Sequence, residues 1–208
     1  RINYIFLLYM PGSAILPATI INGKLYFLFG KENKFEKSAP GFSDFGGGME
    51  KGEKPYEAAI REACEEMTGF LGNEKEVKSL MEKHGTYKVE IENYTSFIFP
   101  LQYDPQLVKY YNNNQKYLQR KLPDNVFKTT RIFEKEEIRW IKADDLKKMR
   151  HKFRHFYRFM VDLLYNEQKQ IKSFIQKGVK KKTRFTKRKR KSIVKNKKSR
   201  KNKNNIKN

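Results

Sequence analysis

The sequence is poor in cysteine and in long apolar runs. Cys64 is the only cysteine among 208 residues, so no disulfide can form within the chain, and a reducing compartment fits this usage. No apolar stretch approaches the roughly 20 residues that a membrane-spanning helix needs. The run Tyr4–Met10 has only about the minimum length of a signal-peptide core, and we interpret it as a strand. Because the chain begins with Arg1, we expect the true start of the protein to lie upstream.

Acidic residues are absent from the last part of the chain. Residues 177–208 hold 17 of the 46 Lys and Arg residues and no Asp or Glu. Residues 1–176 keep 29 basic against 23 acidic residues, which is a net charge of +6 within the total of +23. The tail also has too few apolar residues to build a core. We therefore predict one folded domain over 1–176 and a disordered, basic low-complexity tail over 177–208.

Turn residues divide the first half of the chain into short elements. Asn22-Gly23 separates the apolar runs 14–21 and 24–30 and predicts a tight β-hairpin. Residues 31–45 have the composition of a loop. A proline in the first turn and a glycine at the end predict a helix from Pro55 to about Thr68. The apolar positions at helical spacing, which predict its buried face, are Tyr56, Ala59, Ile60, Ala63 and Met67.

The second half alternates β-branched and aromatic runs with helical patterns. The predicted elements are one or two strands in 86–103, a polar and basic, partly helical insertion in 104–125, a strand at 138–141, a short helix at 144–148 and a long helix over 151–174. This mixture of strands and helices indicates an α/β domain.

Three glutamates lie close together on the first predicted helix. Glu62, Glu65 and Glu66 stand at i, i+3 and i+4 and therefore share one helix face. Such a cluster is either a solvated acidic face or the ligand set of a hard divalent cation, which relieves the repulsion between the carboxylates. The glycines at 46–48 allow close approach of the backbone, and Arg61 can reach back to Glu53.

This segment resembles the box of the Nudix hydrolase family, G-x5-E-x7-R-E-U-x-E-E-x-G-U, in which U is bulky and apolar. The matching residues, within 47–70, are Gly47, Glu53, Arg61, Glu62, Glu65 and Glu66. The chain departs from the pattern at two places. Ala63 is small for a U position, and two residues, Met67 and Thr68, separate the last glutamate from Gly69 where the family has one. The second departure affects the helix exit and not the ligand set.

The resemblance implies a fold and a site. The fold is an α/β/α Nudix sandwich with a mixed sheet. The implied cofactor is Mg²⁺ or Mn²⁺, held by Glu62, Glu65, Glu66 and the Gly46 carbonyl, with Gly47, Glu53 and Arg61 in structural roles. The implied reaction is attack of water on a phosphorus of a nucleoside diphosphate linked to a further group. The general base would be Glu134, Glu136 or Glu137. If these three residues form only a solvated turn, Glu66 could serve as the base instead.

Two basic elements bear on the substrate. The tail segment Lys187, Arg188, Lys189, Arg190 and Lys191 suits phosphate backbones and also fits a nuclear-import patch or a solubilising tail. In the second basic element, MRHKFRHFYRFM at 149–160, Arg150, Arg154 and Arg158 repeat every four residues and would either contact RNA phosphates or form a solvated face. His151 and His155 have a metal-ligand spacing, but no third ligand is apparent, so we interpret them as surface histidines.

The chain also resembles the Nudix mRNA-decapping proteins of large cytoplasmic DNA viruses in its mid-chain box, its helical insertions and its Lys/Asn/Ile-rich composition. Only the box aligns by motif. This similarity implies a viral enzyme that converts capped RNA to m7GDP and 5′-monophosphate RNA, located in the cytoplasm, the nucleus, a viral factory or a virion. The alternatives are a pyrophosphohydrolase of small nucleotides or diphosphoinositol polyphosphates, and a noncatalytic RNA-binding protein. The expected partner is capped RNA or another polyphosphate and not a membrane; the sequence leaves the oligomeric state open.

Overall fold

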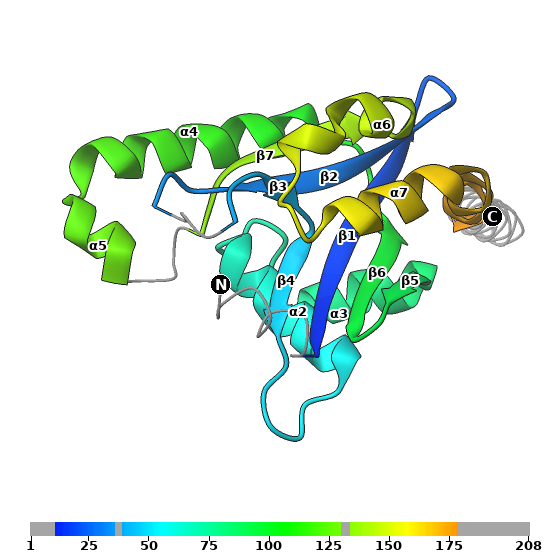
Figure 1. Cartoon of the computed structure of the whole chain (residues 1–208), viewed down its shortest axis with the longest axis horizontal. Helices are drawn as coiled ribbons and strands as arrows, with labels where there is room; N and C mark the ends of the chain where they lie inside the picture. The colour runs from blue at the N-terminus through cyan, green and yellow to red at the C-terminus, as the bar shows by residue number, and fades with distance from the viewer. Residues whose placement is uncertain (1–10, 36–38, 130–133, 179–208) are drawn as a thin grey trace, which may run out of the picture.

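The computed structural model describes residues 11–35, 39–129 and 134–178 (Figure 1). The predicted strand at Tyr4–Met10 and the tail from residue 179 lie outside these ranges. The strands are β1 (Gly12–Ile21), β2 (Lys24–Glu32), β3 (Phe42–Ser43), β4 (Phe45–Gly48), β5 (Tyr87–Ile91), β6 (Tyr94–Pro100) and β7 (Lys135–Lys142). The helices are α2 (Pro55–Glu66), α3 (Glu74–His84), α4 (Pro105–Lys121), α5 (Asp124–Thr129), α6 (Leu146–Met149) and α7 (Arg158–Asn166), with 3-10 turns η2 (Ala143–Asp145) and η3 (Arg150–Lys152). In the described ranges, no helix has the length and apolar character needed to cross a membrane.

The strands form one mixed sheet. β1 pairs antiparallel with β2 and parallel with β6, and β5 and β6 form an antiparallel hairpin. Asn22 and Gly23 join β1 to β2 with φ angles of 48° and 73°, so the predicted tight turn is confirmed. β7 pairs with the other side of β2, and its register runs from Tyr26 opposite Lys142 to Glu32 opposite Lys135.

β1 and β2 separate beyond their hairpin, and β3 and β4 fill the opening between them. β3 pairs with β2 at Gly30 and Lys31, while β4 pairs with β1 from Gly12 to Ile15. Phe42 and Phe45 anchor this segment because both are buried. The prediction of a loop over 31–45 was therefore wrong for residues 31–32, 42–43 and 45, which belong to strands. This insertion places the glycines of β4 beside the first residues of β1.

Helical layers cover both faces of the sheet (Figure 1). Ile15 packs with residues of α2, α3 and α4, whereas its neighbour Leu16 packs with residues of α6, α7 and the helical segment 168–178. The alternation of side chains along a strand sends these two neighbours into different cores. The predicted α/β/α sandwich with a mixed sheet is confirmed.

The ends of the helical regions differ from the sequence-based expectations. The predicted long helix over 151–174 is wrong: η3 and an irregular stretch come first, α7 begins at Arg158, and a turn at Glu167 separates it from the segment 168–178. Helix α3 was not predicted. Its signal is the capping box, in which Asn73 and Glu76 each accept a hydrogen bond from the other's backbone N–H.

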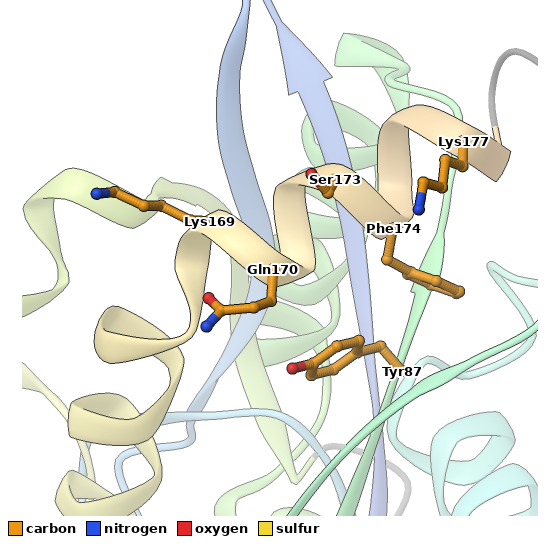
Figure 2. A pocket seen from close by; sticks show the side chains of 6 residues that line it. All are labelled: Tyr87, Lys169, Gln170, Ser173, Phe174 and Lys177. Atoms are coloured by element: carbon orange, nitrogen blue, oxygen red, sulfur yellow. The ribbon is translucent and has the colours of Figure 1, made fainter.

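Segment 168–178 also borders a shallow depression of about 560 Å³ (Figure 2). Its lining includes the rings of Tyr87 and Phe174, whose centroids lie 5.9 Å apart, and the side chain of Lys177. It lies on the α7 layer, whereas the glutamates of α2 belong to the opposite layer.

Helix α4 is fixed to the outer edge of the sheet, beyond β7 (Figure 1). The Asn112 side chain accepts a hydrogen bond from the Ile138 N–H and donates one to the Ile138 carbonyl, at 2.8 and 3.1 Å. The single hydroxyl hydrogen of Tyr111, which is fully buried, is shared between the carbonyls of Glu66 and Lys135, at O···O distances of 2.8 and 3.2 Å. α4 thus satisfies backbone groups at the free edge of β7 and at the end of α2.

We predict that Tyr111→Phe lowers the free energy of unfolding by about 1–2 kcal/mol, because two buried carbonyls lose a donor while the ring stays in place. The measurement is urea unfolding. Tyr110→Phe is the matched control, since the Tyr110 side chain is exposed and should leave stability unchanged. Equal stability of the two variants would contradict the bridging role of Tyr111.

Candidate active site

The glycines of β4 bring backbone against the glutamates of α2. A Cβ atom on Gly47 would lie 2.6 Å from the Glu62 carboxyl group, and one on Gly46 would lie 2.3 Å from the Cβ atom of Ala14. A larger residue at position 46 would therefore have to move β1 or β4, and one at position 47 would displace the Glu62 carboxylate. The absence of side chains lets Glu62 and Glu66 lie directly on β4, with exposed fractions of 8% and 3%.

Arg61 joins the loop to the helix. Its guanidinium donates to both carboxylate oxygens of Glu53 at 2.9 and 3.0 Å and to the Gly48 carbonyl at 3.0 Å. It also contacts Glu62 at 2.9 Å and, more distantly, Glu65 at 3.6 Å. Hydrogen bonds to Arg61 lower the pKa of Glu53. The structure thus joins the predicted residues Glu53 and Arg61 in one bonded unit that also includes Gly48, the neighbour of the predicted Gly47.

Glu66 lies in a different setting, although it is only one helical turn from Glu62. One of its carboxylate oxygens accepts a hydrogen bond from the Gly46 N–H at 3.0 Å. The other lies 3.1 Å from Nζ of Lys135, a fully buried lysine at the start of β7. Burial, opposed by the charge of Lys135, raises the pKa of Glu66, and the charges of Glu32 and Glu134 add to this rise.

Lys135 belongs to a buried cluster of charged groups. Its ammonium also contacts the Glu32 carboxylate and donates to the Ser43 hydroxyl at 2.9 Å. Arg154 contacts the same Glu32 oxygen at 2.7 Å. Burial alone would lower the pKa of Lys135, but the charges of Glu66 and Glu32 outweigh it and raise this pKa. Two carboxylates and two cations therefore balance each other inside the domain.

The cluster was not predicted from the sequence. Lys135 stands within the charged stretch EKEE at 134–137, and such a stretch is ordinarily solvated. Asp44 was also missed: it is 1% exposed and accepts hydrogen bonds from Tyr94 and Ser96, each at 2.7 Å. Only the β2–β7 register, which sets Lys135 opposite Glu32, could have indicated the buried pair.

The three acidic residues considered as general base lie at the start of β7. Glu136 pairs with Lys31 at 2.5 Å, and Glu137 pairs with Arg139 at 2.9 Å. Glu134 lies in the bend just before the strand, and its charge acts on Glu66. All three roles stay predictions.

The donor chemistry of this corner fits a hard divalent cation, because carboxylate and backbone oxygens are its usual ligands. In the present arrangement, Arg61 contacts Glu62, while Lys135 and the Gly46 N–H hold Glu66. Among the residues that the structure describes, no three Asp, Glu, His or Cys side chains converge as they would around a metal. A bound cation would therefore have to take over oxygens that protein cations contact here.

The turn that follows α2 accommodates the extra residue between Glu66 and Gly69, where the family pattern has one residue and this chain has two. Thr68 and Gly69 both adopt positive φ angles, 47° and 79°, and the chain leaves α2 with the Phe70 ring packed against Tyr111. These residues all follow the last glutamate. The departure from the box therefore changes the exit and not the positions of the carboxylates.

The three arginines predicted to contact RNA make hydrogen bonds and ion pairs with other residues of the domain. Arg150 pairs with Asp162 at 2.8 Å, Arg154 pairs with Glu32, and Arg158 donates to the carbonyls of Phe153 and His151 at 3.3 Å. They do not form one helical stripe, because only Arg158 belongs to α7. RNA binding by these residues stays a prediction, as does binding by 187–191, which lie outside the described residues.

We predict that Lys135→Met lowers the free energy of unfolding by about 3–5 kcal/mol, because it leaves Glu32 and Glu66 with an unbalanced buried charge. The control is Lys135→Met combined with Glu32→Gln, which removes one charge of each sign. The double variant should be more stable than the single variant in urea unfolding at pH 7. A single variant as stable as the unsubstituted protein would contradict the charge pairing.

Comparison with known proteins identifies the family. The NUDIX domain model matches residues 13–163. No curated protein matches the chain.

Among solved structures, a C. elegans Ap4A hydrolase in a binary complex is 16% identical, with 82% of this chain and 97% of that chain covered and a TM-score of 0.40. The Nudix hydrolase RenU from M. smegmatis is 15% identical, with 80% and 87% covered and a TM-score of 0.46. At these TM-scores the assignment depends on the domain match, which spans the sheet and the box. The chain belongs to the NUDIX domain family and is a hydrolase acting on a phosphoanhydride bond.

Proposed function

We propose that this enzyme cleaves the pyrophosphate of a nucleoside diphosphate linked to a further group. The observation that supports this best is the set of three glutamates on one turn of α2, of which Glu62 and Glu66 lie against the glycines of β4. Carboxylates brought together in this way suit an electrophilic cation and a phosphate chain better than a neutral substrate.

Each residue of the box has a proposed role. Glu62, Glu65, Glu66 and the Gly46 carbonyl would hold Mg²⁺ or Mn²⁺, since Nudix hydrolases generally need a divalent metal ion. When bound, such an ion lowers the pKa of water and offsets charge on the phosphate oxygens. Glu53, Arg61 and Gly47 keep the glutamates in position.

The attacking water must also lose a proton. We assign this step to Glu134, which lies in the bend just before β7 and whose charge acts on Glu66. Glu66 is the alternative base. In either case the carboxylate would take the proton as the oxygen–phosphorus bond forms and the phosphoanhydride bond breaks.

Capped RNA is the second, finer proposal for the substrate. The observation in its favour is the basic tail, with 17 cations and no acid, because an RNA chain offers many phosphates to such a segment and a small nucleotide does not. Small nucleotides and diphosphoinositol polyphosphates are the competing substrates. The enzyme would act where capped transcripts occur, in the cytoplasm, the nucleus or a viral compartment.

We predict that Glu65→Gln reduces turnover by several orders of magnitude while the fold stays intact. Glu65 suits this test because its side chain is 48% exposed and is contacted by Arg61 only at 3.6 Å. Rates with Mg²⁺ and with Mn²⁺ should be measured on cap-labelled RNA, free cap, Ap4A, ADP-ribose and an inositol pyrophosphate in parallel. Glu82→Gln, an equal charge loss at an exposed position of α3, is the control. Near-normal activity of a folded Glu65→Gln variant would exclude the proposed role.

We also predict that changing all five residues of 187–191 to Gln raises the apparent KM for long capped RNA and reduces its dependence on salt. Each phosphate contact that is lost removes released counterions from the binding equilibrium. Hydrolysis of any accepted small substrate should stay unchanged and serves as the internal control. Equal KM values over a salt series would remove the main argument for RNA as the substrate.

A further inference from the structure

One face of α4 is exposed and has an unusual composition. Its exposed residues are Gln106, Lys109, Tyr110, Asn113, Lys116, Tyr117, Arg120 and Lys121. α4 runs along the outside of the sheet (Figure 1), and this face points away from β7, which the opposite face covers. Neither the proposed catalytic reaction nor the box uses these residues.

Helical spacing sorts this face into three parallel rows. Lys109, Lys116 and Arg120, at i, i+7 and i+11, form a row of cations. Tyr110 and Tyr117 form a second row about 80–100° further round the helix, and their Cα atoms lie about 10 Å apart along the axis. The amides of Gln106 and Asn113 lie between the two rows. We call these seven residues the α4 strip.

The cations of the α4 strip have no acidic partner on their own helix. Residues 105–121 hold four Lys or Arg residues and no Asp or Glu. The two carboxylates at the ends of α4 are engaged: Asp104 accepts a hydrogen bond from the Gln106 N–H at 2.8 Å, and Asp124 lies 3.7 Å from Lys34. The positive charge of the strip is therefore available to an anionic partner.

The tyrosines distinguish this surface from an ordinary solvated helix. Tyr110 and Tyr117 are both 59% exposed, and α4 presents them on the same side at regular spacing. The Lys121 ammonium lies 5.9 Å from the centre of the Tyr117 ring. Exposed aromatic faces beside a row of cations are the elements with which proteins bind single-stranded nucleic acid, since bases stack on the rings while phosphates meet the cations.

The strip is also rigidly held. On the opposite face of α4, Tyr111 and Asn112 make four hydrogen bonds to backbone groups of α2 and β7. The Cα atoms of Tyr110 and Tyr117 therefore keep their relative spacing without a partner. A preorganised surface of this kind loses less conformational freedom on binding.

We infer that the α4 strip is a binding surface for single-stranded nucleic acid. Lys109, Lys116 and Arg120 contact phosphates, Tyr110 and Tyr117 stack with unpaired bases, and the amides donate to base edges or phosphates. Bases of a duplex are already stacked and paired, so the tyrosines select single strands. The inference does not depend on which substrate the enzyme cleaves.

The test is binding of fluorescent twelve-residue oligonucleotides that carry no phosphoanhydride bond, so binding can be measured without hydrolysis. Fluorescence anisotropy would compare oligouridine RNA, oligodeoxyuridine DNA and a duplex of the same length. All proteins are full-length and carry the Gln substitutions at 187–191, so that this cationic segment does not dominate the signal. Preference for RNA over DNA would indicate contacts to the 2′-hydroxyl; equal affinity would indicate readout of bases and phosphates alone.

Two variants separate the contributions. Tyr110→Ala with Tyr117→Ala should weaken binding about tenfold per tyrosine with an unchanged salt slope, and the corresponding Phe double variant should restore it. Lys109→Gln, Lys116→Gln and Arg120→Gln together should lower the slope of log affinity against log salt by about 2, at about 0.7 per phosphate contact. The matched control removes three exposed lysines of α3, Lys75, Lys78 and Lys83, and should bind like the parent protein.

Three results would overturn the inference. One is unchanged affinity of the tyrosine variant, which would exclude stacking. Another is an equal loss in the α3 control, which would reduce the effect to overall charge. The third is duplex binding as tight as single-strand binding. Circular dichroism of each variant verifies that the exposed substitutions leave the fold intact.

Discussion

The candidate site depends on the hydrogen bonds that the guanidinium of Arg61 donates. It binds Glu53 in the loop, Glu62 on the helix and the carbonyl of Gly48, so it fixes three separate pieces of chain with one side chain. Without a cation at this point, Glu53 and Glu62 would repel each other and the loop would lose its bond to α2. The planar, five-donor geometry of arginine is required, because lysine cannot donate in the same pattern.

Lys135 has the equivalent role deeper in the domain. It holds Glu66 at the end of α2 and Glu32 at the end of β2, and Arg154 completes the charge balance. The consequence is a division among the three glutamates of α2: Glu62 faces Arg61, Glu66 faces Lys135, and Glu65 stays largely exposed. Two protein cations thus keep buried carboxylates together, and an incoming cation would have to compete with them for oxygen atoms.

α4 connects this site to the outer surface of the domain. Its buried face donates to the carbonyl of Glu66 and covers the edge of β7, and its exposed face carries the α4 strip. The helix that carries the strip is therefore hydrogen-bonded to the end of α2. In this arrangement, a nucleic-acid strand bound along α4 lies on an element that is hydrogen-bonded to α2.

The sequence by itself determined the box, the helix that carries it and the β1–β2 hairpin, because each depends on local spacing and turn chemistry. The glutamates share a helix face by periodicity, and Asn22-Gly23 sets its turn within two residues. Tertiary structure alone decided which charges are buried. Lys135 and Glu32 lie 103 residues apart in the sequence and are brought together only by the β2–β7 register. Arg154, which was predicted to belong to a row of arginines on one helix, instead contacts Glu32. From the sequence alone, a charged side chain is expected to be solvated, because the partners that would neutralise it lie on other strands. The free energy that offsets its burial comes from the packing of the whole sheet.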